Sequence, residues 1–330
     1  MSDQSSSRNS KPSLASFRYR EKTLASANIE IDEITRYQLP PDLYNMVEEM
    51  VNFSGTVPAD TPMAERCMSR QEAHRVATQN QLLAGELLTR ANTMAGLALR
   101  FTPLPEARWT DAVKQGLSAL FSDTDLAYMQ DAPWNATEHP LPIAAALTRP
   151  KPDFAVGYRA TAPKVGLVAT VPVWSRAFVA AMEEKAGLYL VSHVANSEAK
   201  VLYPFFAFEA KSALGGSFGA ANQLSISLSY ALGRIRQLRT DATGDPITDR
   251  LYLFGAISSG PFWNVYIAYE ADTSATDMEC ASYVGIWYGD VTDPHAALEF
   301  VWIIERIRQW ALSGLKPILT GWLESLRLPP

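Results

Sequence analysis

Cysteine, histidine and long apolar runs are scarce in this 330-residue chain, and each scarcity excludes a class of protein. The two cysteines, Cys67 and Cys280, cannot form a disulfide framework, and with four dispersed histidines they form no recognisable zinc motif. No apolar run approaches the roughly 20 residues that a membrane helix needs. The Ser-rich start lacks the apolar centre of a secretory signal. The sequence therefore favours an intracellular protein, in the nucleus or cytoplasm, that is not secreted and does not bind membranes.

The common cofactor and nucleophile signatures are also missing or incomplete. No P-loop ending in Gly-Lys-Ser/Thr occurs, and the adjacent pair Gly215-Gly216 lacks the spacing of a dinucleotide fingerprint. The same glycine run matches the Gly-x-Ser-x-Gly nucleophile elbow, with Ser217 at its centre and His295 as the downstream base. A hydrolase sheet requires a run of strands before this point, whereas the preceding pattern is mainly helical. A turn that needs glycine is therefore the favoured interpretation over a serine hydrolase.

Charge is unevenly distributed along the chain. The net charge is −6, yet residues 151–240 hold 10 Lys and Arg against 5 Asp and Glu, and the other residues hold 19 against 30. A polyanion would be attracted to the basic segment and repelled by the remainder. The composition, with 47% hydrophobic and 19% charged residues, is that of an ordinary globular protein.

Hydrophobic periodicity and turn residues predict one α/β domain with helical additions. We expect a disordered tail over residues 1–16, a mainly helical N-terminal extension over 17–104, and a domain over 105–330 that ends in helices. Helices are predicted over residues 73–99, from about 105 to 121, and over 174–185, 218–238, 295–311 and 315–326. Strands are predicted over residues 154–158, 201–211, 251–258, 263–270 and 281–288, the last three consecutive and antiparallel.

Two of these strands carry charged residues that suggest chemistry. Asp153 opens the strand KPDFAVGY, and Glu209-Ala210-Lys211 ends the strand VLYPFFAFEAK. Because side chains alternate along a strand, Glu209 and Lys211 project from the same side. If the strands are neighbours, the carboxylates of Asp153 and Glu209, the backbone carbonyl of Ala210 and waters would bind Mg²⁺ or Mn²⁺. Lys211 would then hold the attacking hydroxide or a phosphate oxygen.

The acid-x-Lys triplet is a weak signal by itself, and its context makes it informative. Two more such triplets occur, at Glu183/Lys185 near a helix end and at Glu198/Lys200 in a polar loop. Pro-Asp also occurs a second time at Asp42, where an acid at a helix start is expected. Only the triplet at 209–211 lies on a hydrophobic strand. The structural alternative is a buried ion pair between the lysine and one of the acids.

The order Asp153, Glu209-Ala210-Lys211 and then a helix carrying Gln223 resembles the PD-(D/E)XK nuclease superfamily over about residues 105–290. Within it, the segments KPDFAVGY, YPFFAFEAKS and AANQ resemble a group of fungal nuclease-like proteins, and the N-terminal FRYREKTLASANIEI is also similar to that group. The resemblance implies a restriction-endonuclease-like fold, with a mixed central sheet flanked by helices, and metal-assisted hydrolysis of phosphodiester bonds.

The resemblance implies roles for two further residues. Glu106 matches an acid that the superfamily often carries on the helix before the sheet, and would be a further metal ligand. A glutamate favoured by the helix dipole is the equal alternative. Gln223 resembles a glutamine that supports the metal site in some branches. Its spacing to Ser227, Tyr230 and Arg234 predicts an exposed polar stripe on one helix face.

Two functions from different classes follow. The leading hypothesis is a metal-dependent nuclease whose partner is nucleic acid, DNA favoured over RNA. The alternative is a catalytically silent nuclease-fold module that binds nucleic acid or protein, with the N-terminal helical region as the surface for a protein partner. A glycosidase would use two carboxylates, but it leaves Lys211 without a role. Four aromatic residues near the C-terminal strands would suit base stacking, although core packing is their more frequent fate: Phe262, Trp263, Trp287 and Tyr288.

Overall fold

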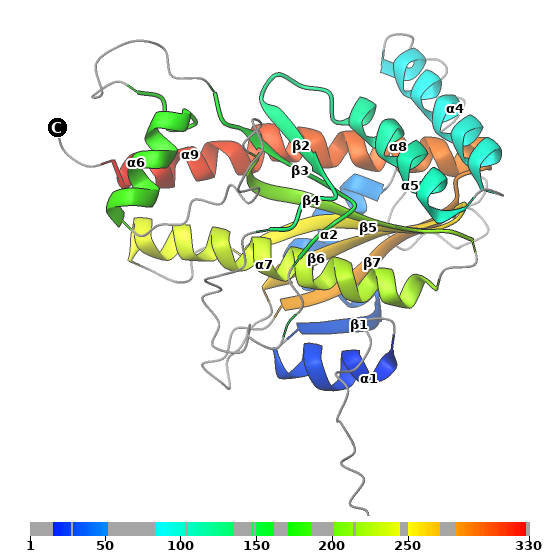
Figure 1. Ribbon diagram of the computed structural model, residues 1–330, viewed down its shortest axis with the longest axis horizontal. Coiled ribbons are helices and arrows are strands. Elements are labelled where there is room, and N and C mark those ends of the chain that lie inside the picture. Colours follow the sequence, from blue (N-terminus) through cyan, green and yellow to red (C-terminus); the bar gives the residue numbers. More distant parts are fainter. Residues whose placement is uncertain are drawn as a thin grey trace, which may run out of the picture.

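The computed structural model describes residues 16–27, 29–51, 83–102, 105–134, 147, 150–161, 171–186, 201–213, 216–244, 250–270 and 281–327. Within this part, seven strands form one mixed sheet in the order β1-β7-β6-β5-β4-β3-β2 (Figure 1). The pairs β1/β7 and β4/β5 are parallel, and the other neighbours are antiparallel. The predicted α/β class is therefore confirmed. The strands are β1 (Ile29–Thr35), β2 (Leu126–Gln130), β3 (Phe154–Arg159), β4 (Val201–Lys211), β5 (Tyr252–Ser259), β6 (Phe262–Glu270) and β7 (Ala281–Asp290).

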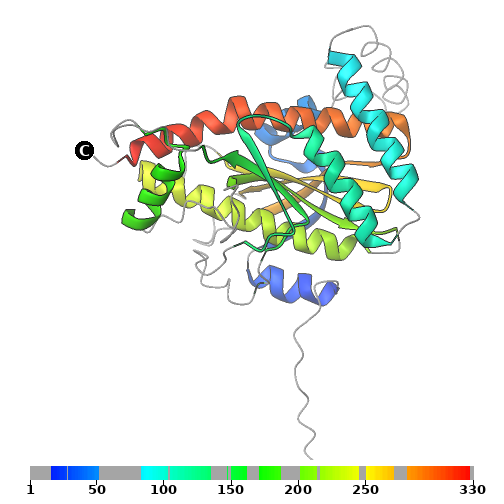
Figure 2. The same ribbon diagram turned by 45° about the horizontal axis from the view of Figure 1, so that its top comes forward.

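Helices cover both faces of the sheet. Figure 1 shows α7 lying along one face and α5 and α8 along the other. The single π-helical turn η5 joins α8 to α9, and the three run on as one long rod (Figure 2). No described helix is both long and apolar enough to cross a membrane. The described helices are α1 (Phe17–Tyr19), η1 (Arg20–Leu24), η2 (Arg36–Gln38), α2 (Pro41–Val51), α4 (Leu83–Phe101), α5 (Glu106–Leu120), α6 (Arg176–Ala186), α7 (Ser217–Thr243), α8 (Pro294–Trp310), η5 (Ala311–Leu315) and α9 (Lys316–Ser325).

Individual contacts identify the two faces of the central strands. A Cβ atom at Gly255 of β5 would lie 2.7 Å from Leu224 and 2.9 Å from Leu228, so this strand approaches α7 closely. On the opposite face, the ring of Trp263 lies 5.1 Å from that of Phe208 and 4.7 Å from that of Phe300 on α8. Because Gly255 pairs with Ala207, the odd-numbered residues at this end of β4 face α7.

Most predicted elements are confirmed, with boundaries shifted by a few residues. β3, β4 and the antiparallel series β5-β6-β7 occupy the predicted segments. The helix predicted from residue 73 is described only from Leu83, since residues 52–82 lie outside the described part. Two strands escaped prediction, β1 and β2, and both lie at the edges of the sheet. β1 lies within the N-terminal extension, so this segment contributes a strand to the main sheet.

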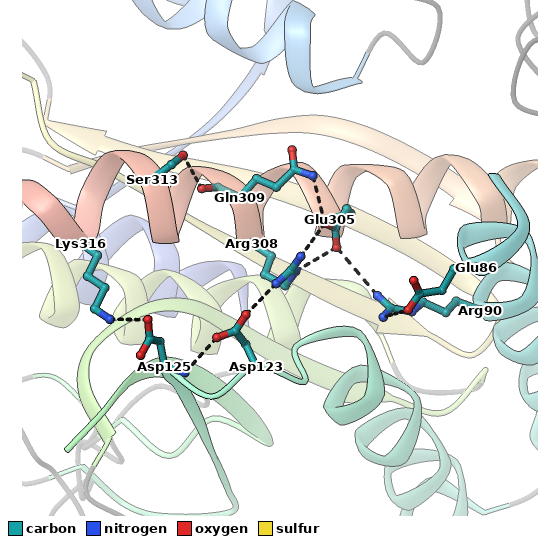
Figure 3. Close-up of polar contacts among 9 residues, drawn as sticks. All are labelled: Glu86, Arg90, Asp123, Asp125, Glu305, Arg308, Gln309, Ser313 and Lys316. Carbon is teal, nitrogen blue, oxygen red and sulfur yellow. Dashed lines mark hydrogen bonds and ion pairs between the residues drawn. The ribbon is translucent and has the colours of Figure 1, made fainter. Parts of the chain in front are cut away.

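A polar network fastens α8 to the elements beside it. The Arg308 guanidinium hydrogen-bonds the Glu305 carboxylate at 2.7 Å and the Asp123 carboxylate at 2.9 Å (Figure 3). Glu305 also lies 3.8 Å from Arg90 of α4, whose own helix partner is Glu86. The network thereby ties α4 and the turn before β2 to α8, on the face of the sheet opposite α7.

Candidate active site

The carboxylates proposed from the sequence lie opposite one another on neighbouring strands. In the antiparallel pair β3/β4, Phe154 faces Phe208, which places Asp153 across from Glu209. The Asp153 Oδ2 atom accepts a 2.7 Å hydrogen bond from the backbone N–H of Ala210. The Lys211 carbonyl accepts from Gly260 on the β5 side at 2.8 Å. Because backbone groups alternate direction along a strand, the Ala210 carbonyl points toward β3 and Asp153.

Glu209 is a buried acid, with 2% of its surface exposed. Its carboxylate accepts no hydrogen bond within the described part of the chain, although it lies close enough to Asp153, Lys211, Asp131 and Lys114 to feel their charges. Burial raises the pKa of Glu209 well above its usual range, and the Asp153 carboxylate raises it further, against an opposing effect from Lys211. Such a group is stable as a neutral acid or as the ligand of a cation.

Asp153 is less deeply placed and better supported. Burial raises the pKa of Asp153, and three opposing effects reduce the rise: the Ala210 hydrogen bond and the charges of Lys211 and Lys114. The negative charge of Asp131 raises the pKa of Asp153 further. The two facing acids therefore repel one another when both are ionised. A divalent cation between them would relieve that repulsion.

Lys211 closes β4 and lies at the margin of the buried acids. Its side chain is 23% exposed, and its Nζ atom lies 3.4 Å from the Glu106 carboxylate at the start of α5. Glu106 therefore lies beside the lysine of this cluster, and its role as a metal ligand stays a prediction. Its observed contact is with the lysine, which makes it a counter-ion here.

Two residues of this cluster were not anticipated from the sequence, Lys114 and Asp131. Lys114 on α5 is buried and forms an ion pair with Asp131 at 2.5 Å. Asp131 follows β2, and its backbone N–H donates to the Asp153 carbonyl at 3.3 Å. Its φ of 48° lies in the left-handed region, which aspartate tolerates better than most residues. In the sequence, Lys114 is a lysine among apolar positions of a predicted helix. The same pattern occurs wherever the polar and apolar faces of an amphipathic helix meet, so it does not mark a functional residue.

The structure corrects one expectation about α7. Gln223 is half-buried, but Ser227, Tyr230 and Arg234 are buried, so the predicted exposed polar stripe is wrong. The Tyr230 ring lies 5.9 Å from that of Trp134, and the Tyr230 hydroxyl accepts from Arg234 at 3.1 Å. No described contact links Gln223 to the carboxylates, so its supporting role stays a prediction.

The remaining candidates from the sequence differ in how far they are exposed to solvent. Ser217 is an exposed first residue of α7, and no hydrogen bond joins it to His295 among the described residues. Of the four aromatic candidates, Trp263 is buried and Trp287 is half-buried against Phe300. Phe262 and Tyr288 are exposed. Core packing therefore accounts for two of the four.

The donor set fits a hard divalent cation. Asp153, Glu209 and the Ala210 carbonyl are oxygen donors, and Glu209 is a buried carboxylate without a hydrogen bond among the described residues. In the described part, no group of three or more His, Cys, Asp and Glu side chains lies in metal-binding proximity, so waters or substrate oxygens would have to complete the shell. A search of the sequence against protein-family models and against curated proteins finds no match.

Proposed function

We propose that this protein is a metal-dependent nuclease of the PD-(D/E)XK type, acting on DNA in preference to RNA. The observation that carries the proposal is the Asp153 carboxylate bonded at 2.7 Å to the Ala210 N–H, which sets it opposite the buried Glu209 and beside Lys211. Two facing carboxylates that each disfavour ionisation, with a lysine at their margin, suit Mg²⁺ or Mn²⁺ and an anionic substrate.

The chain's own residues have distinct roles in this proposal. Asp153, Glu209 and the Ala210 carbonyl hold the ion, which when bound lowers the pKa of a bound water and neutralises charge on the phosphate. The Lys211 side chain is partly exposed at the margin of the buried acids, where it can contact a phosphate oxygen or the attacking oxygen. Glu106 orients Lys211 through their 3.4 Å ion pair. The Lys114–Asp131 pair supports the end of β2 against Asp153.

The chain order around the site supports the proposed restriction-endonuclease-like fold. The elements α5, β2, β3, β4, α7 and β5 occur in this order as helix, three strands, helix and strand, with the helix α6 inserted between β3 and β4. The three strands are antiparallel neighbours, and β5 returns parallel to β4 after α7. This arrangement supports the mixed sheet between helices that the resemblance implies, with Asp153 directly before the second of the three strands and Glu209 on the third.

The competing function is a nuclease-fold binding module without catalysis. It is favoured by the charge pairing already present: Lys211 is engaged by Glu106, and Lys114 by Asp131. A module of this kind would retain the acids as a structural cluster.

Cleavage assays with matched variants distinguish these functions. Single-stranded and duplex DNA and RNA are incubated with Mg²⁺, Mn²⁺ or EDTA and wild type, Lys211→Ala or Lys185→Ala. Lys185 belongs to another Glu-x-Lys triplet, on α6. We expect metal-dependent cleavage that Lys211→Ala lowers by at least about 100-fold and that Lys185→Ala preserves. Equal loss in both variants, or cleavage in EDTA, would contradict the proposed site.

A further inference from the structure

A pair of exposed aromatic rings, Phe262 and Tyr288, lies on the sheet near the candidate active site. Phe262 is 46% exposed and Tyr288 is 60% exposed, although both residues lie on strands. Their rings are parallel within 8°, with centroids 6.2 Å apart. Surface rings scattered singly need no explanation, whereas two exposed rings in contact form a small apolar patch that could bind a ligand.

Strand register places this pair on the same face as the acids and the lysine. Glu209 pairs with Ile257, Ile257 with Asn264, and Asn264 with Tyr288. In the next row, Lys211 pairs with Ser259, Ser259 with Phe262, and Phe262 with Asp290. Directly paired residues share a face of the sheet. Glu209, Lys211, Phe262 and Tyr288 therefore all belong to the face that α7 covers in part.

The spacing suits a nucleic-acid strand. Neighbouring strands lie about 4.8 Å apart, so Phe262 is about 10 Å from Lys211 across the sheet, and Tyr288 about 14 Å from Glu209. These distances span only a short stretch of a nucleic-acid strand. A strand whose phosphate reaches Lys211 would thus bring bases a few nucleotides away over the two rings.

Charges beside the rings favour a polyanion on this face. Lys211 lies on one side. On the other, the guanidinium of Arg20 lies 3.8 Å from the ring centroid of Phe218 and donates to Asn222 at 3.1 Å. Burial raises the pKa of Tyr266, which follows Asn264 on the same face of β6, and the positive charge of Arg20 opposes that rise. One acid also lies on this face: Asp290, which pairs with Phe262 and whose Oδ1 atom accepts from the Thr292 backbone N–H at 2.9 Å and hydroxyl at 2.6 Å.

We infer that Phe262 and Tyr288 form a stacking platform for unpaired bases, so that the substrate is single-stranded DNA or a single-stranded segment beside the cleaved bond. This inference rests on the proposed nuclease function and adds the substrate class. Bases in a duplex are stacked on their neighbours and present no face to a protein ring, whereas every unpaired base does. The platform consequently selects for strand state and not for sequence.

Binding measured without cleavage tests the platform separately from catalysis. Fluorescence anisotropy in EDTA follows a labelled 20-nucleotide single strand and the same sequence as a duplex. The proteins are wild type, Phe262→Ala, Tyr288→Ala, Tyr288→Phe and the control Tyr128→Ala. Tyr128 is 45% exposed on β2, stacks on Phe154 and lies on the opposite face of the sheet. Equal melting temperatures verify that the variants are folded.

We expect wild type to bind the single strand more tightly than the duplex. Phe262→Ala and Tyr288→Ala should weaken single-strand binding by about 5-fold to 150-fold each, because aromatic stacking on a base has that value in other single-strand binders. Tyr288→Phe and Tyr128→Ala should bind as wild type does. Duplex preference, absence of single-strand binding, or equal binding by the alanine variants would overturn the platform. Single-strand binding that depends on the rings, in a protein that cleaves nothing, would support the platform and refute the nuclease.

Discussion

The Asp153 carboxylate and the Ala210 backbone N–H, 57 residues apart in the sequence, are joined by a 2.7 Å hydrogen bond. This bond connects a loop residue to the central strand β4, and it fixes the aspartate opposite Glu209. One oxygen of the carboxylate is used for position, which leaves the other available for a cation. Position and proposed chemistry therefore depend on the same side chain.

Asp153→Asn should separate these two uses. The amide oxygen can still accept the Ala210 N–H, so the variant should fold with a melting temperature within a few degrees of wild type, while the loss of charge weakens metal binding. Mn²⁺ at about 100 times its dissociation constant should stabilise wild type by about 2.7 kcal/mol and the variant much less. Thermal melts with and without Mn²⁺ measure this. Asp111→Asn, at an exposed acid on α5, is the control that should respond as wild type does.

Glu209→Gln should stabilise the metal-free protein at neutral and alkaline pH. The pKa of Glu209 is raised by burial and by Asp153, so the folded state holds a proton that the unfolded chain releases above its pKa of about 4.3. Stability of wild type therefore falls as pH rises above that value, by at most about 1.4 kcal/mol per unit from this group. Urea unfolding in EDTA from pH 5 to pH 8 should give a flatter profile for the variant. Parallel profiles would show that the glutamate is not held neutral.

Lys114→Met should move metal binding to higher pH. Burial is the main cause of the raised pKa values of Glu209 and Asp153, and the Lys114 charge opposes it at both acids. Removal of that charge leaves the carboxylates harder to ionise, while methionine fills the volume of the buried lysine. Calorimetric titration of Mn²⁺ at several pH values should detect the shift. Lys114→Arg should restore the wild-type pH dependence; if it fails to do so, Lys114 acts through packing instead of charge.

Glu305→Gln should destabilise the protein at neutral pH by about 1–3 kcal/mol, since Arg308 and Arg90 lose a charged partner. Burial alone would raise the pKa of Glu305, but hydrogen bonds and charge from Arg308 hold it below its usual value. The contribution is present above the unfolded pKa of about 4.3 and is lost as pH falls through the lower folded pKa. Urea unfolding at pH 7 and pH 3 should show the difference between variant and wild type shrinking in acid. A constant difference would attribute the loss to packing.

The candidate site was partly accessible from sequence because its signals are local. Asp153 and the triplet Glu209-Ala210-Lys211 stand out as charges on hydrophobic strands, and alternation places Glu209 and Lys211 on one side. Asp131 and Lys114 carry no such contrast, since Asp131 directly follows a short strand and Lys114 is one charged residue within an amphipathic helix. Their relevance arises from strand pairing and from a helix crossing over the sheet, which no periodicity encodes.

Edge strands and covered faces account for the other differences. β1 and β2 lie at the two edges of the sheet, where a strand is stabilised by its one neighbour more than by its own pattern. The polar face of α7 looks like a solvated helix by spacing, but Trp134 packs against Tyr230 and Arg234 is buried. Such coverage is a property of distant segments.

The sequence by itself determined the α/β class, the long buried strand β4 and the identity of three charged candidates, because hydrophobic runs and alternation are governed by neighbouring residues. The tertiary structure decided which charged side chains lie close together. The register of β3 on β4 set Asp153 opposite Glu209, and the register of β4 through β7 placed Phe262 and Tyr288 on the same face as Lys211. Register depends on the packing of the whole sheet against its helices, because a slip of one residue reverses the face of every side chain.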